Sequence, residues 1–178
     1  MSRGESRPHW RTIAAGGLIL VSVLYGAPRI VNAAESGAAY VQPEDLTAAA
    51  WVSENVPEDA LFMTNMFWFD FLPDFVIASD AGGWLPVLAR RAAFVPPMIY
   101  PLERTAEPEY NKRLVALAHI ATDMTSEPAL ELLHREGITH VFIGQRGGSI
   151  DPAQLLASQD YALEYHEANT YVFRVLEK

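Results

Sequence analysis

The chain has 178 residues, room for one domain of ordinary size, and half of them are hydrophobic, which excludes a disordered chain. It contains no cysteine, which excludes disulfides, thiolate zinc sites and cysteine nucleophiles. The net charge is −9, and from residue 35 onward 21 acidic residues stand against 9 basic ones. Because so acidic a surface repels phosphate backbones and anionic lipid headgroups, we expect no nucleic-acid partner.

An uncharged, largely apolar run of seventeen residues, 12–28, lies near the N-terminus. Seventeen residues of helix span about 25 Å, and the arginines on either side of the run can snorkel to close the gap to a full bilayer. Basic residues precede the run, so the N-terminus is expected inside the cell and the remainder outside. Residues 12–28 are therefore expected to contact the membrane.

Two interpretations of this segment remain open. Residues 1–34 form either a cytoplasmic stub with a retained transmembrane helix or a signal peptide cleaved after small residues near Val31-Asn32-Ala33. The first predicts a single-pass protein of the cell membrane, and the second predicts a secreted one. Both predict an extracytoplasmic domain over residues 35–178.

Helices and strands are expected to alternate along that domain. A proline and two acids in a first turn predict a helix opening at Gln42-Pro43-Glu44-Asp45, and short apolar runs bounded by turn residues predict strands. The expected elements of the first half are strands over 60–64 and 75–78, a loop over 79–83, a helical turn over 84–91 and an extended piece over 93–96.

In the second half, the residues that begin and end each element are easier to identify. Helices are expected over 107–122 and from Ser126 to Arg135, then a strand over 139–143, a glycine loop over 144–148, a helix over 151–158, and a hairpin that pairs 161–165 with 171–176. Such alternation predicts an α/β fold: a small layered sheet with flanking helices and a C-terminal β-hairpin, preceded by one N-terminal transmembrane or signal helix.

The usual catalytic and metal-binding motifs are missing. The histidines form no HExxH or HxH pattern, although His134 and His140 end one element and begin the next. No GxSxG or Asp-x-Asp motif occurs, and Ser79 after a predicted strand is the nearest approach to a nucleophile. We therefore expect no catalytic residue, no metal site and no cofactor within this chain.

Two loops are the candidates for ligand contact. Aromatic rings beside carboxylates contact sugars, as in Asp80–Trp84, and a glycine loop after a strand can present backbone N–H groups to an anion, as in Gly144–Gly148. Each also has a purely structural interpretation, as a pinned loop or as a turn that needs glycine. For the aromatic residues between Phe67 and Phe75, core packing, membrane contact and ligand stacking stay open. The candidate ligand-binding residues are Asp80, Gly82, Gly83, Trp84, Arg90 and Arg146.

Several short segments resemble a known class of protein. They are Ala50-Trp51-Val52, Val56–Phe62, Asp80–Pro86, Gly137–Gly144 and Val172–Val175. With the apolar segment before them, they resemble the C-terminal extracytoplasmic domain of multi-pass bacterial membrane proteins that are similar to glycosyltransferases using lipid-linked sugars.

The resemblance implies that this chain has no catalytic role by itself. In that class the catalytic acid lies in a loop between the first membrane helices, and this chain has one candidate membrane helix and no such loop. We therefore expect a non-catalytic accessory domain that contacts a multi-pass membrane partner or a glycan. The alternative is a secreted α/β domain that binds or hydrolyses a small ligand, with Asp80, Trp84, Arg90 and Arg146 around one cleft.

Overall fold

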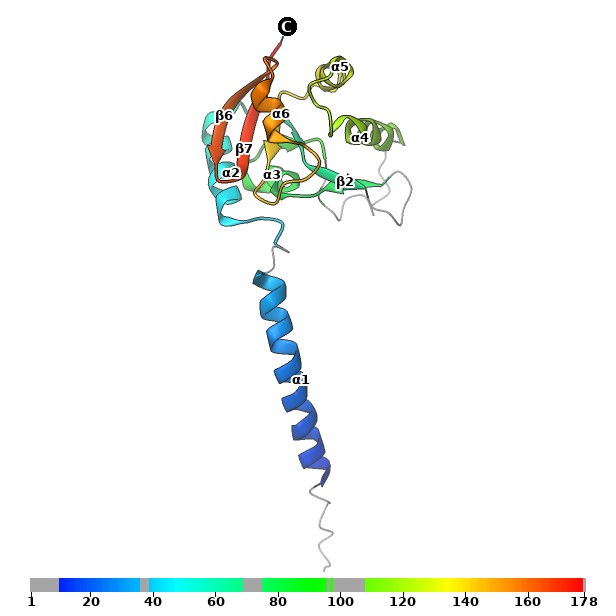
Figure 1. Ribbon diagram of the computed structural model, residues 1–178, viewed down its shortest axis with the longest axis vertical. Coiled ribbons are helices and arrows are strands. Elements are labelled where there is room, and N and C mark those ends of the chain that lie inside the picture. The colour runs from blue at the N-terminus through cyan, green and yellow to red at the C-terminus, as the bar shows by residue number, and fades with distance from the viewer. Residues whose placement is uncertain (1–9, 36–38, 69–74, 96, 98–107, 178) are drawn as a thin grey trace, which may run out of the picture. The chain divides into compact units, whose positions relative to one another are not determined.

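The computed structural model describes residues 10–35, 39–68, 75–95, 97 and 108–177 (Figure 1). Contacts divide the chain into two compact units, Met1–Ala39 and Tyr40–Lys178. The first unit contains helix α1 (Trp10–Glu35), and the second contains all the strands of the described residues.

Helix α1 confirms the expected N-terminal helix. Four consecutive residues, Leu18 to Val21, are each at least 60 % exposed in this chain. Since successive residues lie about 100° apart around a helix, apolar side chains are present on every side of it. Within the described residues, no helix combines the length and apolarity that crossing a bilayer requires.

A mixed five-stranded sheet forms the centre of the second unit. Its order is β4 (Ala92–Ala93), β1 (Leu61–Thr64), β5 (His140–Ile143), β7 (Thr170–Val175) and β6 (Tyr161–Glu167). Strand β1 is parallel to β4 and β5, whereas β5–β7 and β7–β6 are antiparallel. The α/β class and the C-terminal hairpin are thus confirmed.

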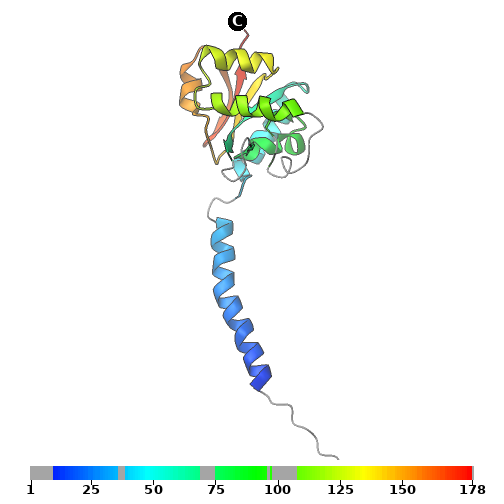
Figure 2. The same cartoon turned by 90° about the vertical axis from the view of Figure 1, so that its right-hand side faces the viewer.

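Helices cover both faces of this sheet. Alternate residues of the central strands point to opposite faces, so Met63, Val141 and Phe173 join one core, and Phe62, Phe142 and Val172 join the other. The first core lies under α4 (Pro108–Ile120), α5 (Glu127–Arg135) and α6 (Pro152–Ala157), and the second under α2 (Pro43–Asn55), η1 (Ala81–Trp84) and α3 (Leu85–Leu88). Figure 2 shows α4 and α5 in front of the sheet.

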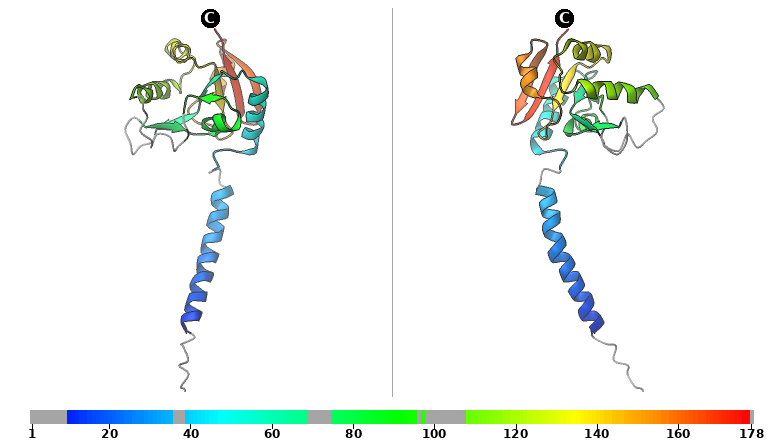
Figure 3. Two further views of the ribbon diagram at one scale, coloured as in Figure 1. Left: turned by 180° about the vertical axis from the view of Figure 1, so that it is seen from behind. Right: turned by 45° about the vertical axis from the view of Figure 1, so that its right-hand side comes forward.

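The expected strand over 75–78 does not join the main sheet. Strand β3 (Val76–Ala78) instead pairs antiparallel with β2 (Met66–Trp68), which the sequence did not predict, and the pair lies beside α4 (Figure 3). Of the aromatic cluster, Phe69 and Phe71 lie outside the described residues. Trp68 is 39 % exposed, and its ring is 5.1 Å from that of His119.

Two adjacent arginines follow α3 and lie in opposite environments. Arg90 is exposed and has a φ of 55°, which turns the chain back toward the sheet. Arg91 is buried, and its guanidinium donates hydrogen bonds to the carbonyls of Ser53, in the last turn of α2, and of Val56, which follows the helix. Because these carbonyls have no partner within the helix, Arg91 caps α2 and complements the negative end of its dipole.

Candidate functional site

The two candidate loops meet at one end of the sheet. Strands β1 and β5 are parallel neighbours, so the residues that follow them, Asn65 and Gly144, leave the sheet at the same edge. Asp80, which follows β3, bridges them: one carboxylate oxygen accepts from the Gly144 N–H at 2.7 Å and from the Asn65 amide at 2.9 Å. The other oxygen accepts from the Gly82 N–H at 2.9 Å.

A second buried carboxylate holds the next residue of the glycine loop. Asp45, in the first turn of α2, accepts from the Gln145 N–H at 2.7 Å and from the Thr170 hydroxyl at 3.3 Å. Its other oxygen accepts from the Gln42 N–H at 2.9 Å. Sequence reasoning missed this role, since an acid near a helix N-terminus is explained by the dipole alone.

Side chains also hold the remainder of the glycine loop by hydrogen bonds. The Asn65 side chain accepts from the Ile150 N–H at 2.9 Å, and the Ser79 hydroxyl donates to the Gly147 carbonyl at 3.3 Å. A Cβ at Gly148 would lie 2.5 Å from the Ser79 hydroxyl oxygen, so this position has no room for a side chain. Ser79 was the residue that came nearest to a predicted nucleophile. It is buried, and its hydroxyl holds the loop through the hydrogen bond to Gly147.

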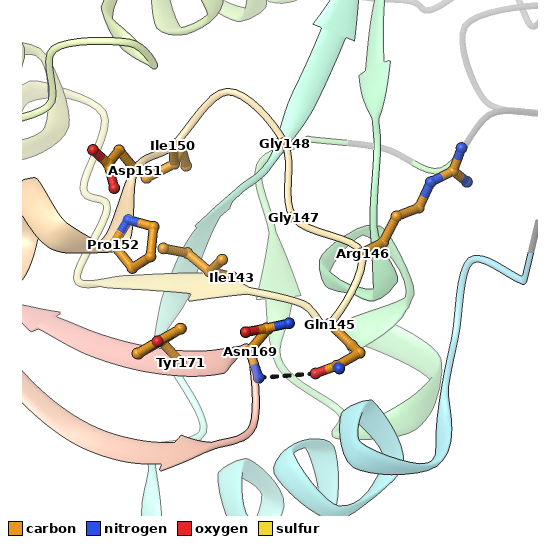
Figure 4. A pocket seen from close by; sticks show the side chains of 10 residues that line it. All are labelled: Ile143, Gln145, Arg146, Gly147, Gly148, Ile150, Asp151, Pro152, Asn169 and Tyr171. Atoms are coloured by element: carbon orange, nitrogen blue, oxygen red, sulfur yellow. Dashed lines mark hydrogen bonds between the residues drawn. The ribbon is translucent and has the colours of Figure 1, made fainter. Parts of the chain in front are cut away.

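A pocket of about 400 Å³ lies against this loop (Figure 4). Loop residues 145–148 form one wall, Asp151 and Pro152 at the start of α6 form another, and Asn169 and Tyr171 of the hairpin form a third. The Gln145 side chain joins two walls, because its carbonyl oxygen accepts from the Asn169 N–H at 2.9 Å (Figure 4). The polar side chains that line the pocket are thus two amides, a carboxylate, a phenol and the guanidinium of Arg146.

Stacking fixes the tyrosine of the pocket. The Tyr171 ring lies 4.2 Å from the His166 ring and 5.9 Å from the Phe173 ring, measured between centroids, at 11° in both cases. Neighbours in this row hold the ring in one orientation. The groups of Tyr171 that remain for the pocket are therefore the ring edge and the hydroxyl.

The six candidate residues occupy different environments. Asp80, Gly82 and Gly83 are buried, and a Cβ at either glycine would lie 2.5 Å from side-chain atoms of Thr64 or Ala78. Trp84, 36 % exposed, and Arg90 lie on the η1–α3 segment and do not line the pocket.

Arg146 is the one candidate residue that lines the described pocket. Its side chain points away from the other lining residues (Figure 4). The guanidinium lies over the Tyr40 ring, 4.5 Å from the centroid. A cation in that position is attracted to the face of the ring, so Arg146 is oriented by Tyr40.

Burial raises the pKa of Asp80 to about 6. Hydrogen bonds from Asn65, Gly144 and Gly82 oppose this shift, and the like charge of Asp45 adds to it. The carboxyl group of Asp80 therefore changes its charge at a mildly acidic pH.

A separate polar network lies at the amino end of β5, away from the pocket. The His140 ring contacts the Thr139 hydroxyl at 2.8 Å and the Glu164 carboxylate at 3.4 Å, and burial lowers its pKa despite the Glu164 charge. His134 lies exposed on α5. The part of the chain that the structure describes contains no cluster of three or more metal-binding side chains.

Neither a protein-family model nor a curated protein matches this chain. Among solved structures, it is similar to the C-terminal globular domain of the oligosaccharyltransferase from Archaeoglobus fulgidus. The TM-score is 0.46 at 12 % sequence identity, over 78 % of this chain and 100 % of that chain. The similarity concerns the arrangement of the backbone.

Proposed function

We propose that this chain is an extracytoplasmic accessory domain, non-catalytic by itself, that binds a sugar residue of a glycan in the pocket beside the Gly144–Gly148 loop. The observation that supports this most directly is the lining. Two amides, the Asp151 carboxylate, the fixed edge of Tyr171 and the Arg146 segment line a pocket of about 400 Å³. The resemblance of the sequence to tail domains of glycosyltransferase-like proteins supplies the context, an assembly with a multi-pass membrane partner.

The chemistry of the lining favours a neutral, hydroxyl-rich ligand. The Asn169 amide can donate and accept, the Gln145 NH₂ can donate, and the Asp151 oxygen that does not cap α6 can accept, which matches the hydroxyls of a sugar ring. Among its described lining residues the pocket has no histidine, serine, threonine or lysine. The pocket is therefore suited to holding a sugar.

We expect weak, saturable binding of neutral sugars. A monosaccharide has about twelve non-hydrogen atoms, and about 0.3 kcal/mol per atom gives a Kd of roughly 2 mM. Titration of the full chain with N-acetylglucosamine, glucose and mannose, followed by NMR, measures it. Asn169→Ala and Tyr171→Phe should each weaken binding about five- to tenfold, because each removes one hydrogen-bonding group.

Trp84→Ala and Arg90→Ala are the matched controls, since both residues are exposed and lie outside the pocket lining. We expect binding to be unchanged in both. A loss of binding in these variants and not in Asn169→Ala would move the site to the η1–α3 segment. Saturation by none of the three sugars would contradict the proposal.

The non-catalytic part of the proposal has its own test. The full chain is incubated with lipid-linked sugar donors and peptide or sugar acceptors, and products are followed by mass spectrometry. We expect no turnover, because the chain supplies binding groups and the resemblance places the catalytic acid in another polypeptide region. Transfer or hydrolysis by this chain alone would overturn it.

We also propose that the apolar residues of α1 direct the domain out of the cytoplasm. In a bacterial host, alkaline phosphatase fused after the C-terminus should be active, and replacing Arg3, Arg7 and Arg11 by glutamate should reduce that activity roughly tenfold, because orientation follows basic residues before the apolar run. A fused green fluorescent protein should stay dark. Bright fluorescence with inactive phosphatase would refute the location.

A further inference from the structure

We propose that the segment of η1 and α3 forms a docking patch for the surface of a lipid bilayer. The patch consists of exposed residues from one short stretch of the chain: Trp84, Pro86, Val87 and Arg90. None of them lines the described pocket, so the patch is a second contact surface of the domain. It relies on the proposed membrane contact of α1 only to bring a bilayer within reach.

The opposite side of the segment is packed in the core, which keeps the apolar side chains of the patch in solvent. Leu85 and Ala89 are fully buried in the core that α2 covers, and residues four apart lie on the same side of a helical turn. Val87 lies midway between them, so its side chain is on the solvent side and is 74 % exposed.

Hydrogen bonds and close packing hold both ends of the segment. At its start, the Asp80 carboxylate accepts from the Gly82 N–H at 2.9 Å, and a Cβ at Gly83 would lie 2.5 Å from a side-chain atom of β3. At its end, Arg91 donates to the carbonyl that follows α2. The exposed apolar side chains therefore belong to an ordered surface, and a partner can bind it without ordering the backbone first.

The charge of this segment differs from that of the whole chain. From Ala81 to Val95 there are two arginines and no acidic residue, in a chain of net charge −9. Arg91 is buried against the end of α2, so Arg90 is the exposed cation of the segment. Anionic headgroups attract this segment and repel the acidic residues elsewhere, which favours one orientation of the domain on the bilayer.

The residue types of the patch match the boundary between lipid headgroups and acyl chains. Tryptophan is favoured at the level of the headgroups, an aliphatic side chain enters the acyl region, and arginine keeps its charge near the phosphates while its stem stays apolar. So few apolar side chains bind a bilayer only weakly by themselves. Helix α1, with apolar side chains on every side, supplies another contact in the same chain and makes docking of the patch an intramolecular step.

A single fluorescent label tests the patch, because the chain has no cysteine. The full chain with Val87→Cys is labelled and incorporated into vesicles of phosphatidylcholine and phosphatidylglycerol. Leu156→Cys, with the same label, is the control, since Leu156 is 52 % exposed on α6 at the opposite face of the sheet. We expect a nitroxide on the lipid acyl chains to quench the label at residue 87, and iodide in the water to quench the label at residue 156.

Two further substitutions in the labelled Val87→Cys chain separate the contributions of charge and apolar surface. Arg90→Ala should lower the ratio of docked to undocked domain about fivefold on the same vesicles, because one arginine near an anionic surface is lost. On vesicles of phosphatidylcholine alone, Arg90→Ala should leave the ratio unchanged. Trp84→Ala should lower the ratio on both kinds of vesicle.

Equal quenching of the two labels by iodide would overturn the docking patch, and so would a chain that stays in solution beside the vesicles. A label at residue 87 that is shielded from iodide but not quenched by the lipid nitroxide would show that protein covers the patch, such as a second copy of this chain, and would also overturn it. These results depend neither on sugar binding nor on the side of the membrane that the domain occupies. Failure of the proposed function and failure of the docking patch are therefore distinguishable.

Discussion

Replacing Arg91 by alanine is expected to lower the free energy of unfolding by about 3–5 kcal/mol. The guanidinium donates to the carbonyls of Ser53, Val56, Ala89 and Arg90, with the shortest hydrogen bond, to Val56, at 2.6 Å. Without it, the carbonyls at the end of α2 are buried without a partner, which costs about 1–3 kcal/mol each. Urea unfolding followed by circular dichroism measures the loss.

The neighbouring Arg90 provides a matched control for this prediction. It is exposed, so Arg90→Ala should change the free energy of unfolding by no more than about 0.5 kcal/mol. Arg91→Lys keeps the charge but loses the fork of donors, and we expect a loss between those of the two alanine variants. Equal effects of Arg90→Ala and Arg91→Ala would show that Arg91 does not cap α2.

Asp80 is expected to make the domain less stable as the pH rises from about 4 to about 7. Its pKa is about 6 in the folded protein, against an ordinary value of 3.8, so between these values the folded state binds more protons than the unfolded state. The stabilisation is complete below the lower value and is lost as the pH rises through 6. For this shift it amounts to on the order of 3 kcal/mol.

A comparison with Asp80→Asn isolates this contribution. The free energy of unfolding is measured across the range for both proteins, and the wild-type value minus the variant value should fall by about 3 kcal/mol. His140, whose lowered pKa acts in the opposite direction, is present in both proteins and cancels. A difference that rises with pH would mean that the hydrogen bonds to Asp80 outweigh its burial.

Local patterns in the sequence were sufficient for much of the fold. The apolar run at 139–143 and the turn near Ala168 predicted β5 and the C-terminal hairpin, because period and turn chemistry act between near neighbours. The run at 75–78 predicted a strand but not its partner. Strand β3 pairs with β2, and the hydrogen bond from the Ser79 N–H to the Asn65 carbonyl extends that ladder, a partnership that the local pattern of 75–78 does not encode.

For the candidate site, too, part could be predicted from the sequence and part could not. Its two loops were identified from glycine, acid and aromatic residues near strand ends, and they do meet at one end of the sheet. The role of each residue was not identifiable, because a charged side chain on a short segment has no local signal for burial. Arg90 and Arg91 are adjacent and alike in type, yet one is exposed and the other caps a helix.

What the sequence by itself determined about this protein is the order of its elements, its acidic character and the positions of its two glycine-containing loops. Only the tertiary structure decided which polar groups serve those loops. The hydrogen bonds of the Gly144 and Gln145 amides join residues 64 and 100 positions apart in the chain. Such contacts depend on how the layers pack, so Asp45 and Asp80 acquire their role only when α2 and η1 lie against the end of β5.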